Sequence, residues 1–147
     1  MRIVGRGFTY EDLSVGFSFR THRRTINEAD LAAFVNLTWL TEELFTVADD
    51  ASRAIKGRAV PAALVYSFAE GLLLPTMQDT GLAFLDARLD VKAPTLVGDT
   101  IQVECEVTEQ RVTSKGDRGL VRFANKVVNQ RGETVLAYNP LRLLKRK

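Results

Sequence analysis

The residue in this sequence whose position is best suited to chemistry is Glu70, an acid inside an otherwise apolar segment at about residues 61–74. Burial in apolar surroundings raises the pKa of a carboxyl group, and such shifts are common among carboxylates that act as bases or nucleophiles. Acids are rarely placed in a buried helix without a partner. The alternative interpretation is therefore that Glu70 faces solvent or pairs with an arginine.

Other standard chemistry is scarce. The only histidine, His22, shares a polar, strand-patterned segment with Arg20 and Arg24, where no residue orients it for proton transfer. The chain has no paired-cysteine motif, His-Glu-x-x-His helix, glycine-rich phosphate loop or Gly-x-Ser-x-Gly elbow. Metal sites and catalytic triads are disfavoured, and we expect no bound metal and no resident cofactor.

Composition restricts the class of protein and its partners. With 147 residues and 46% hydrophobic content, the chain is expected to form one domain over residues 1–147. Its 20 basic and 18 acidic residues give no overall field that favours nucleic acid or a membrane surface. The first 13 residues lack an apolar signal segment, and one cysteine, Cys105, excludes an internal disulfide. We therefore expect a cytoplasmic protein.

The order of the elements predicts the fold class. One apolar helix, at about residues 61–74, is followed by little except strand-patterned sequence. A helix this apolar must be buried, and a curving sheet provides the cover. We expect an α+β fold in which an antiparallel β-sheet wraps around one long central α-helix.

Alternation of apolar and polar residues locates the strands. Ile101, Val103, Cys105 and Val107 alternate with polar residues and so define one buried face. Residues 83–91 alternate in the same way, which predicts a second buried face, and residues 120–129 and 133–144 are rich in β-forming residues. Glycines in the connectors 114–117 and 130–132 supply the positive φ of hairpin turns. The second half of the chain is thus predicted to be a meander.

A shorter helix is predicted in the first third of the chain. Asn27 suits its N-cap, and the helix is expected to end near Thr38. The predicted buried face consists of Leu31, Phe34, Val35 and Thr38. Beyond this helix, residues 39–59 are long and weakly patterned, which is typical of segments that carry function.

Several motifs, in this order, resemble the MaoC-like hydratases and dehydratases, which have the hot-dog fold and act on acyl-CoA thioesters. The motifs are Tyr-Glu-Asp-Leu-Ser-Val-Gly at 10–16, Thr-Ile-Asn-Glu-Ala-Asp at 25–30, Gly-Arg at 57–58 and Pro-Thr-Leu-Val-Gly-Asp-Thr at 94–100. Asn-Gln-Arg-Gly-Glu at 129–133 is most similar to the branch that includes mesaconyl-CoA hydratases. The resemblance implies a hot-dog fold and an acyl-CoA ligand.

The chain departs from this family at the residues that transfer protons. Counting from the short helix, Leu40 stands at the family's Asp or Asn position and Phe45 at its His position. In the family this pair activates water for addition to an enoyl-CoA, a task that a leucine and a phenylalanine cannot perform. Glu42 and Glu43 occupy the intervening Asn-Pro positions, so they are candidate replacement bases or, alternatively, part of a solvated loop.

The resemblance also assigns possible binding residues. Pro61-Ala62 replaces the family's polar pair at the start of the long helix, which leaves the backbone N–H groups of Ala62 and Ala63 to polarise a thioester carbonyl. Trp39 is a candidate for lining the acyl groove, together with Leu40 and Phe45. Basic residues suit the CoA phosphates; those near the expected mouth of the groove are Arg53, Lys56 and Arg58.

Three functions remain open on the sequence. The chain is a degenerate member that keeps the acyl-CoA site, an enzyme with relocated chemistry, or a structural subunit. In an enzyme with relocated chemistry the candidates are Glu70 and the Glu42-Glu43 pair. Glu70 is a candidate because some hot-dog thioesterases place a carboxylate on this helix. A curved sheet around one helix leaves open edges, so we expect a homodimer or higher homo-oligomer, or a pairing with a homologous subunit.

Overall fold

The computed structural model describes residues 1–48 and 52–147. The helices of this part of the chain are η1 (Tyr10–Asp12), α1 (Glu28–Thr38), α2 (Glu43–Thr46), α3 (Ala62–Leu72) and α4 (Leu74–Met77). The strands are β1 (Ser18–Arg20), β2 (Arg24–Thr25), β3 (Ala59–Val60), β4 (Gly81–Asp86), β5 (Leu89–Val91), β6 (Thr95–Leu96), β7 (Thr100–Val112), β8 (Arg118–Val128), β9 (Thr134–Tyr138) and β10 (Leu141–Lys145).

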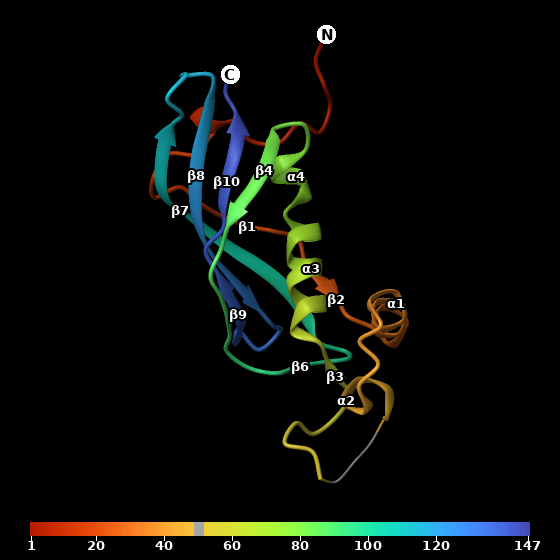
Figure 1. Ribbon diagram of the computed structural model, residues 1–147. Helices are drawn as coiled ribbons and strands as arrows, with labels where there is room; N and C mark the ends of the chain where they lie inside the picture. Colours follow the sequence, from red (N-terminus) through yellow and green to blue (C-terminus); the bar gives the residue numbers. More distant parts are fainter. Residues whose placement is uncertain (49–51) are drawn as a thin grey trace.

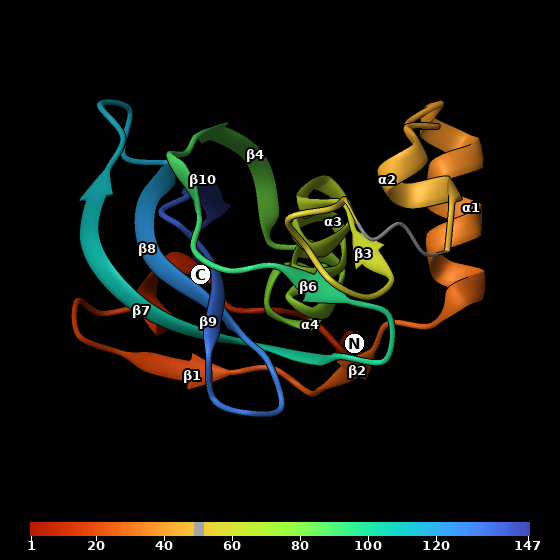
Figure 2. The same cartoon turned by 90° about the horizontal axis from the view of Figure 1, so that it is seen from below.

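A strongly curved antiparallel sheet dominates the molecule. Its strands follow the order β1-β7-β8-β10-β4, with β2 paired to β7, and β9 paired to both β8 and β5. Figures 1 and 2 show α3 lying along the concave face of this sheet, with α1 and α2 on the far side of α3 from β7 and β8. The predicted α+β architecture, an antiparallel sheet around a central helix, is confirmed.

The alternating pattern of β7 does place its apolar residues in the core. Ile101, Val103, Cys105 and Val107 are at most 4% exposed, and they meet Leu64, Val65 and Ala69 of α3 or the residues around Leu13. The predicted hairpin glycines also have the expected backbone, with φ of 74° at Gly116 and 76° at Gly132. Local sequence patterns therefore specify the meander.

The central helix is shorter and more open than expected. α3 ends at Leu72, and after Leu73 the chain begins the separate short helix α4, with a proline in its first turn. The prediction of full burial was wrong, because Ala63, Ser67 and Gly71 are exposed. These residues, four apart, form one line along the helix on the side that the sheet does not cover.

α1 begins as predicted. The Asp30 backbone N–H donates to Asn27 Oδ1 at 2.9 Å, and the Asn27 N–H donates to Asp30 Oδ2 at 3.0 Å, which makes a reciprocal cap. The helix ends at Thr38, as expected. The predicted burial of Thr38 was wrong: its side chain is exposed, and its hydroxyl donates to the Phe34 carbonyl at 2.7 Å.

The alternation over residues 83–91 does not bury a face in the single chain. Every residue of β4 is exposed, with Leu82 at 39%, Phe84 at 43% and Leu85 at 51%. β4 is the last strand of the sheet, so only one of its edges is hydrogen-bonded, to β10. The prediction failed because it assumed a covering layer that one copy of the chain does not supply.

Candidate functional site

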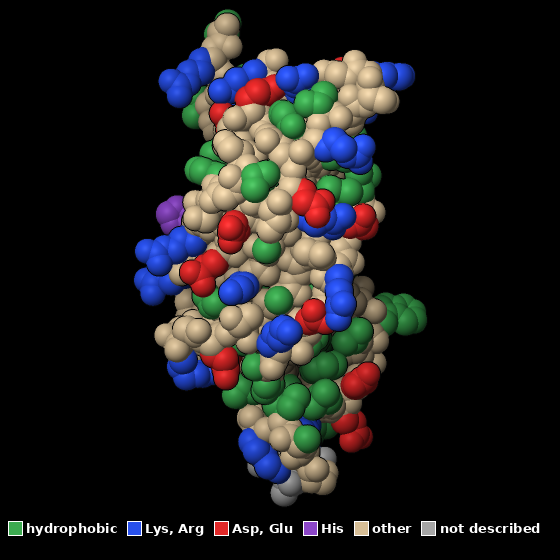
Figure 3. All heavy atoms as spheres, turned by 90° about the vertical axis from the view of Figure 1, so that its left-hand side faces the viewer, with side chains coloured by type: hydrophobic (Ala, Val, Ile, Leu, Met, Phe, Trp, Pro, Cys, Tyr) green, Lys and Arg blue, Asp and Glu red, His purple; other side chains and the backbone are tan. Residues whose placement is uncertain are grey.

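An apolar cavity of about 160 Å³ lies at the start of α3. Its lining comes from α2, β3, α3, β5, β6, β9 and the segments beside them: Leu44, Phe45, Ile55, Ala59, Val60, Ala62, Val65, Val91, Ala93, Pro94, Thr95, Val135 and Leu136. Hydrophobic side chains also gather on the lower half of the face in Figure 3, at the end of the molecule that holds β3 and β6 in Figure 1. This end of the protein suits an apolar ligand.

A short strand pair builds the cavity mouth. β3 pairs with β6 so that Val60 lies opposite Thr95. α3 begins two residues after Val60, with Pro61 as its N-cap, so Ala62 and Thr95 both reach the cavity. α2 brings Phe45, which is half-buried, to the opposite wall. Pairing between segments about 35 residues apart thus assembles the site.

Within residues 1–48 and 52–147, no side chain that lines the cavity is an acid, a base or another ionisable group. The Leu64 and Val65 N–H groups both donate to the Pro61 carbonyl, at 3.0 and 3.2 Å. The N–H groups of Ala62 and Ala63 come before these donors in the chain, where a helix offers no carbonyl to accept from them. Such groups at a helix N-terminus attract a partially negative oxygen. The cavity is therefore suited to holding an apolar group beside a carbonyl, and none of its described lining side chains is an acid or base that could supply a proton.

Only some of the predicted binding residues meet at this cavity. Phe45 and Ala62 line it, but Leu40, Trp39 and Ala63 are not among the lining residues. Trp39 is 86% exposed, at the end of α1, where its φ of 64° is left-handed. Sequence reasoning missed Thr95, whose only signal was its place in the Pro-Thr-Leu-Val-Gly-Asp-Thr motif.

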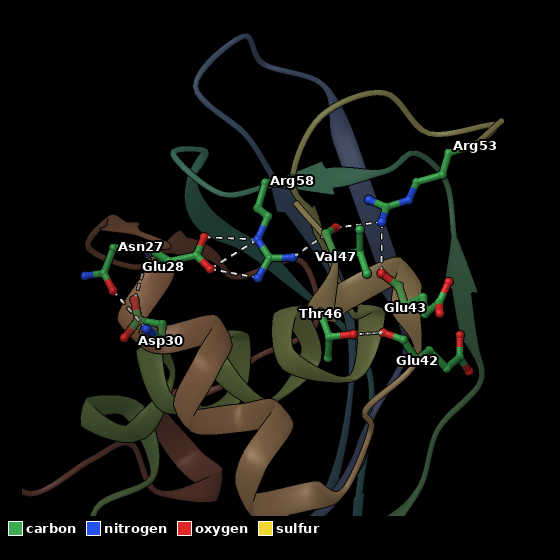
Figure 4. A network of polar contacts seen from close by, with 9 residues as sticks. All are labelled: Asn27, Glu28, Asp30, Glu42, Glu43, Thr46, Val47, Arg53 and Arg58. Carbon is green, nitrogen blue, oxygen red and sulfur yellow. Dashed lines mark hydrogen bonds and ion pairs between the residues drawn. The ribbon is translucent and has the colours of Figure 1, made fainter. Parts of the chain in front are cut away.

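Arg58 links the first turn of α1 to the end of α2 (Figure 4). Its Nε donates to both Glu28 oxygens at 3.1 Å and its Nη2 to Glu28 Oε1 at 2.7 Å. Its Nη1 donates to the Val47 carbonyl at 3.4 Å. The hydrogen bonds to Arg58 lower the pKa of Glu28, and those to Glu28 raise the pKa of Arg58. A CoA phosphate at Arg58 has to compete with Glu28.

Arg53 has a similar bracing role at α2. Its Nη2 donates to the Glu43 carbonyl at 2.9 Å and to the Val47 carbonyl at 2.6 Å (Figure 4). Arg53 thus caps the C-terminal end of the short helix that carries Phe45. Lys56, the third predicted basic residue, is exposed.

Glu42 and Glu43 lie outside the cavity. Both are exposed, and neither is a lining residue. The Glu42 carbonyl, not its carboxylate, accepts the Thr46 hydroxyl at 3.1 Å (Figure 4). His22 is also exposed, between β1 and β2. Among the residues that the structure describes, no group of three or more His, Cys, Asp or Glu side chains is placed to hold a metal, and no helix is long and apolar enough to cross a membrane.

Glu70 lies in a separate, largely buried polar cluster between α3 and the sheet. Its Oε2 accepts the Tyr138 hydroxyl at 2.7 Å and Arg142 Nη2 at 2.6 Å. The Arg142 and Glu70 side chains are 7% and 25% exposed. Tyr66 packs against Tyr138 with ring centroids 4.8 Å apart. The arginine partner that the sequence left open is Arg142, an inward-facing cation between apolar residues of β10.

This cluster holds its tyrosine protonated. Burial, followed by the adjacent charge of Glu70 and the hydrogen bond to it, raises the pKa of Tyr138 far above its usual range. Burial also raises the pKa of Tyr66, and the Glu70 charge adds to that shift. A carboxylate that accepts from both a tyrosine and an arginine is stabilised where it stands. The geometry therefore suits a link between helix and sheet better than a free nucleophile.

Cys105 gives a test of this packing at alkaline pH. Burial raises the pKa of its thiol to about 12, whereas an unfolded cysteine titrates near about 8.5. The unfolded chain therefore loses this proton first, and stability should be complete below about pH 8.5 and fall as the pH rises toward 12. Chemical denaturation between about pH 8 and 10 should show this fall, and the variant Cys105→Ala should flatten it. If stability falls with pH as steeply in Cys105→Ala as in the parent protein, the buried thiol is not the cause of the fall.

The arrangement defines a class of protein: an α+β protein with a hot-dog fold and an apolar cavity at the start of its central helix. The family described as the FAS1-like, dehydratase domain region matches residues 14–138. The chain therefore belongs to that family, and the predicted kinship with MaoC-like hydratases and dehydratases is confirmed.

Solved structures of other proteins agree with this family membership. The chain is similar to a MaoC-like dehydratase from Rhodospirillum rubrum, with 25% identity, a TM-score of 0.81 and coverage of 96% of this chain and 99% of that one. The R-hydratase PhaJ1 from Pseudomonas aeruginosa gives 25% identity, a TM-score of 0.78 and coverage of 96% and 88%. A Mycobacterium tuberculosis protein with a double hot-dog fold is 24% identical, with a TM-score of 0.82; the match covers 99% of this chain and 46% of that one. No curated protein matches the sequence.

Proposed function

We propose that this protein binds acyl-CoA thioesters without carrying out the hydration typical of its relatives. The observation that carries the proposal is the apolar cavity, which opens at the start of α3 and has no ionisable side chain among its described lining residues. Adding water to an enoyl thioester requires groups that accept and donate protons at the reacting carbons. With Leu40 and Phe45 at the family's catalytic positions, the site keeps the means to hold an acyl group and loses the means to transform it.

Glu70 supports this interpretation over a thioesterase. Its carboxylate is committed to Tyr138 and Arg142, and it is not among the residues that line the cavity. A nucleophilic role requires Glu70 to leave both partners and reach a thioester at another place. The protein thus serves as a binding or partner subunit in acyl-CoA metabolism.

Calorimetric titration with butanoyl-CoA and free CoA tests the proposal. We expect butanoyl-CoA to bind more tightly by about 2 kcal/mol, because its hydrocarbon chain moves from water into the cavity. The variant Glu70→Gln should bind butanoyl-CoA like the parent protein. Equal affinity for butanoyl-CoA and CoA contradicts an acyl site.

We propose further that the working form is a homodimer that joins along β4. The exposed line Ala63, Ser67 and Gly71 lies on α3, which runs beside β4 in Figures 1 and 2. Two copies of an edge strand pair antiparallel about a two-fold axis, and small helix residues let the second copy approach closely. The relative with a double hot-dog fold supports this arrangement, since the chain spans 46% of its length.

Charge on β4 should separate the two copies. Leu85 is 51% exposed, and Leu85→Lys places an unpaired cation in the proposed contact. We expect sedimentation to show a dimer for the parent protein and a folded monomer for this variant. Val15→Lys is the control, because Val15 is at least as exposed as Leu85, at 61%, and lies outside β4 and α3. Dimers that persist in Leu85→Lys overturn the proposed interface.

A further inference from the structure

We propose that the cavity selects compact, uncharged acyl groups of about six carbons and rejects those that carry a free carboxylate, and that Thr95 is its hydrogen-bonding residue. This inference rests on the proposed function for the identity of the ligand. The nature of the cavity itself is argued from the lining residues alone.

Thr95 is the polar exception in an otherwise apolar wall. It is 4% exposed, and its side chain belongs to the cavity lining. Among the hydrogen bonds between described residues, its hydroxyl donates none, and its Oγ1 is not one of the buried side-chain atoms that lack a partner. The hydroxyl is therefore not a sealed donor. Among the described lining residues it is the one side-chain group that can donate a hydrogen bond to a ligand oxygen in the cavity.

The position of Thr95 fits a thioester carbonyl. Its register partner is Val60, which is two residues before Ala62, at the beginning of α3. A carbonyl oxygen between them accepts from the Thr95 O–H and lies near the backbone N–H groups of the first helical turn. The carbon chain then extends into the apolar part of the cavity, toward Phe45.

The volume sets the size of that chain. An apolar cavity of about 150 Å³ stays dry and binds benzene, a molecule of about six carbons. The cavity here holds about 160 Å³ and has similar walls of Leu, Ile, Val and Phe. Affinity should rise about fourfold for each methylene until about six carbons are buried, and then level off.

Charge sets the second limit. No cationic side chain is among the described residues that line the cavity, and the nearby guanidinium of Arg58 is already paired with Glu28. A buried carboxylate without a partner is strongly unfavourable. Mesaconyl-CoA, whose acyl group carries a carboxylate, should therefore bind at least about thirtyfold more weakly than hexanoyl-CoA.

Two probes without CoA test the cavity and Thr95. Amide NMR titrations with benzene and with cyclohexanone are made on the full chain and on the variants Thr95→Val and Thr95→Ser. Both probes should bind the parent protein. Thr95→Val should weaken cyclohexanone about fivefold to tenfold and leave benzene within about twofold, and Thr95→Ser should preserve both affinities. Absence of benzene binding, or an equal loss for both probes, overturns the inference.

A titration series of acyl-CoA esters from acetyl to decanoyl, with mesaconyl-CoA, tests the selection. A plateau near hexanoyl and weak mesaconyl binding support the inference. Mesaconyl-CoA that binds as tightly as hexanoyl-CoA overturns it. If no acyl-CoA binds while the two probes behave as expected, the acyl-CoA assignment and the proposed function fail together, and the apolar cavity with Thr95 as its donor still stands.

Discussion

Replacing Arg142 by methionine should lower the free energy of unfolding by about 3 kcal/mol. The change leaves the Glu70 carboxylate between helix and sheet without the cation that now lies 2.6 Å from it. Removing one partner of a buried pair is costly because the remaining charge stays desolvated. The value lies at the lower end of the usual range because Glu70 is one quarter exposed. Urea denaturation measures the loss.

The double variant Glu70→Leu/Arg142→Met is the matched control. With both charges removed, most of the stability should return, because apolar side chains of similar size fill the space. If the double variant loses as much unfolding free energy as Arg142→Met alone, the two charges are not linked as described. A full loss of thioester binding in a folded Glu70→Gln variant instead assigns Glu70 to the site.

The variant Ala62→Phe should abolish the preference for butanoyl-CoA over CoA, a loss of about 2 kcal/mol. Ala62 lines the cavity at the first position of α3, and a benzyl group there occupies the space that the acyl chain needs. We expect the thermal midpoint to remain close to that of the parent protein. Competition titration between the two ligands gives the affinity ratio directly.

Ala32→Phe makes the same change in size at an exposed position of α1, outside the cavity lining. It should keep the parent affinity for butanoyl-CoA. Should both variants bind like the parent, the acyl chain does not enter this cavity, and the search for the site has to move elsewhere on the fold.

Local patterns were sufficient for most of the fold. The alternation of β7, the cap at Asn27 and the hairpin glycines depend on neighbours in sequence, and each was predicted correctly. The errors concern residues whose environment depends on distant elements. Thr38 and the face of β4 have apolar or amphipathic patterns, but the single chain provides no layer to cover them.

The site was less predictable. The kinship directed attention to Phe45 and Ala62, which the cavity does bring together. The motif that contains Thr95 did not indicate that this residue lines the cavity, because its place opposite Val60 depends on pairing between β3 and β6, strands of two residues each. Likewise, Arg142 meets Glu70 only through the wrapping of the sheet around α3, a contact across 72 residues. Such contacts between distant segments have no local sequence signal.

The central claim is that the protein holds acyl thioesters without transforming them. The most direct test is one assay with crotonyl-CoA and mesaconyl-CoA at saturating protein, which follows enoyl absorbance and release of free thiol together. We predict that both signals stay constant while crotonyl-CoA is bound. Loss of enoyl absorbance without release of thiol establishes a hydratase, and thiol release that disappears in Glu70→Gln establishes a thioesterase; either result contradicts the claim.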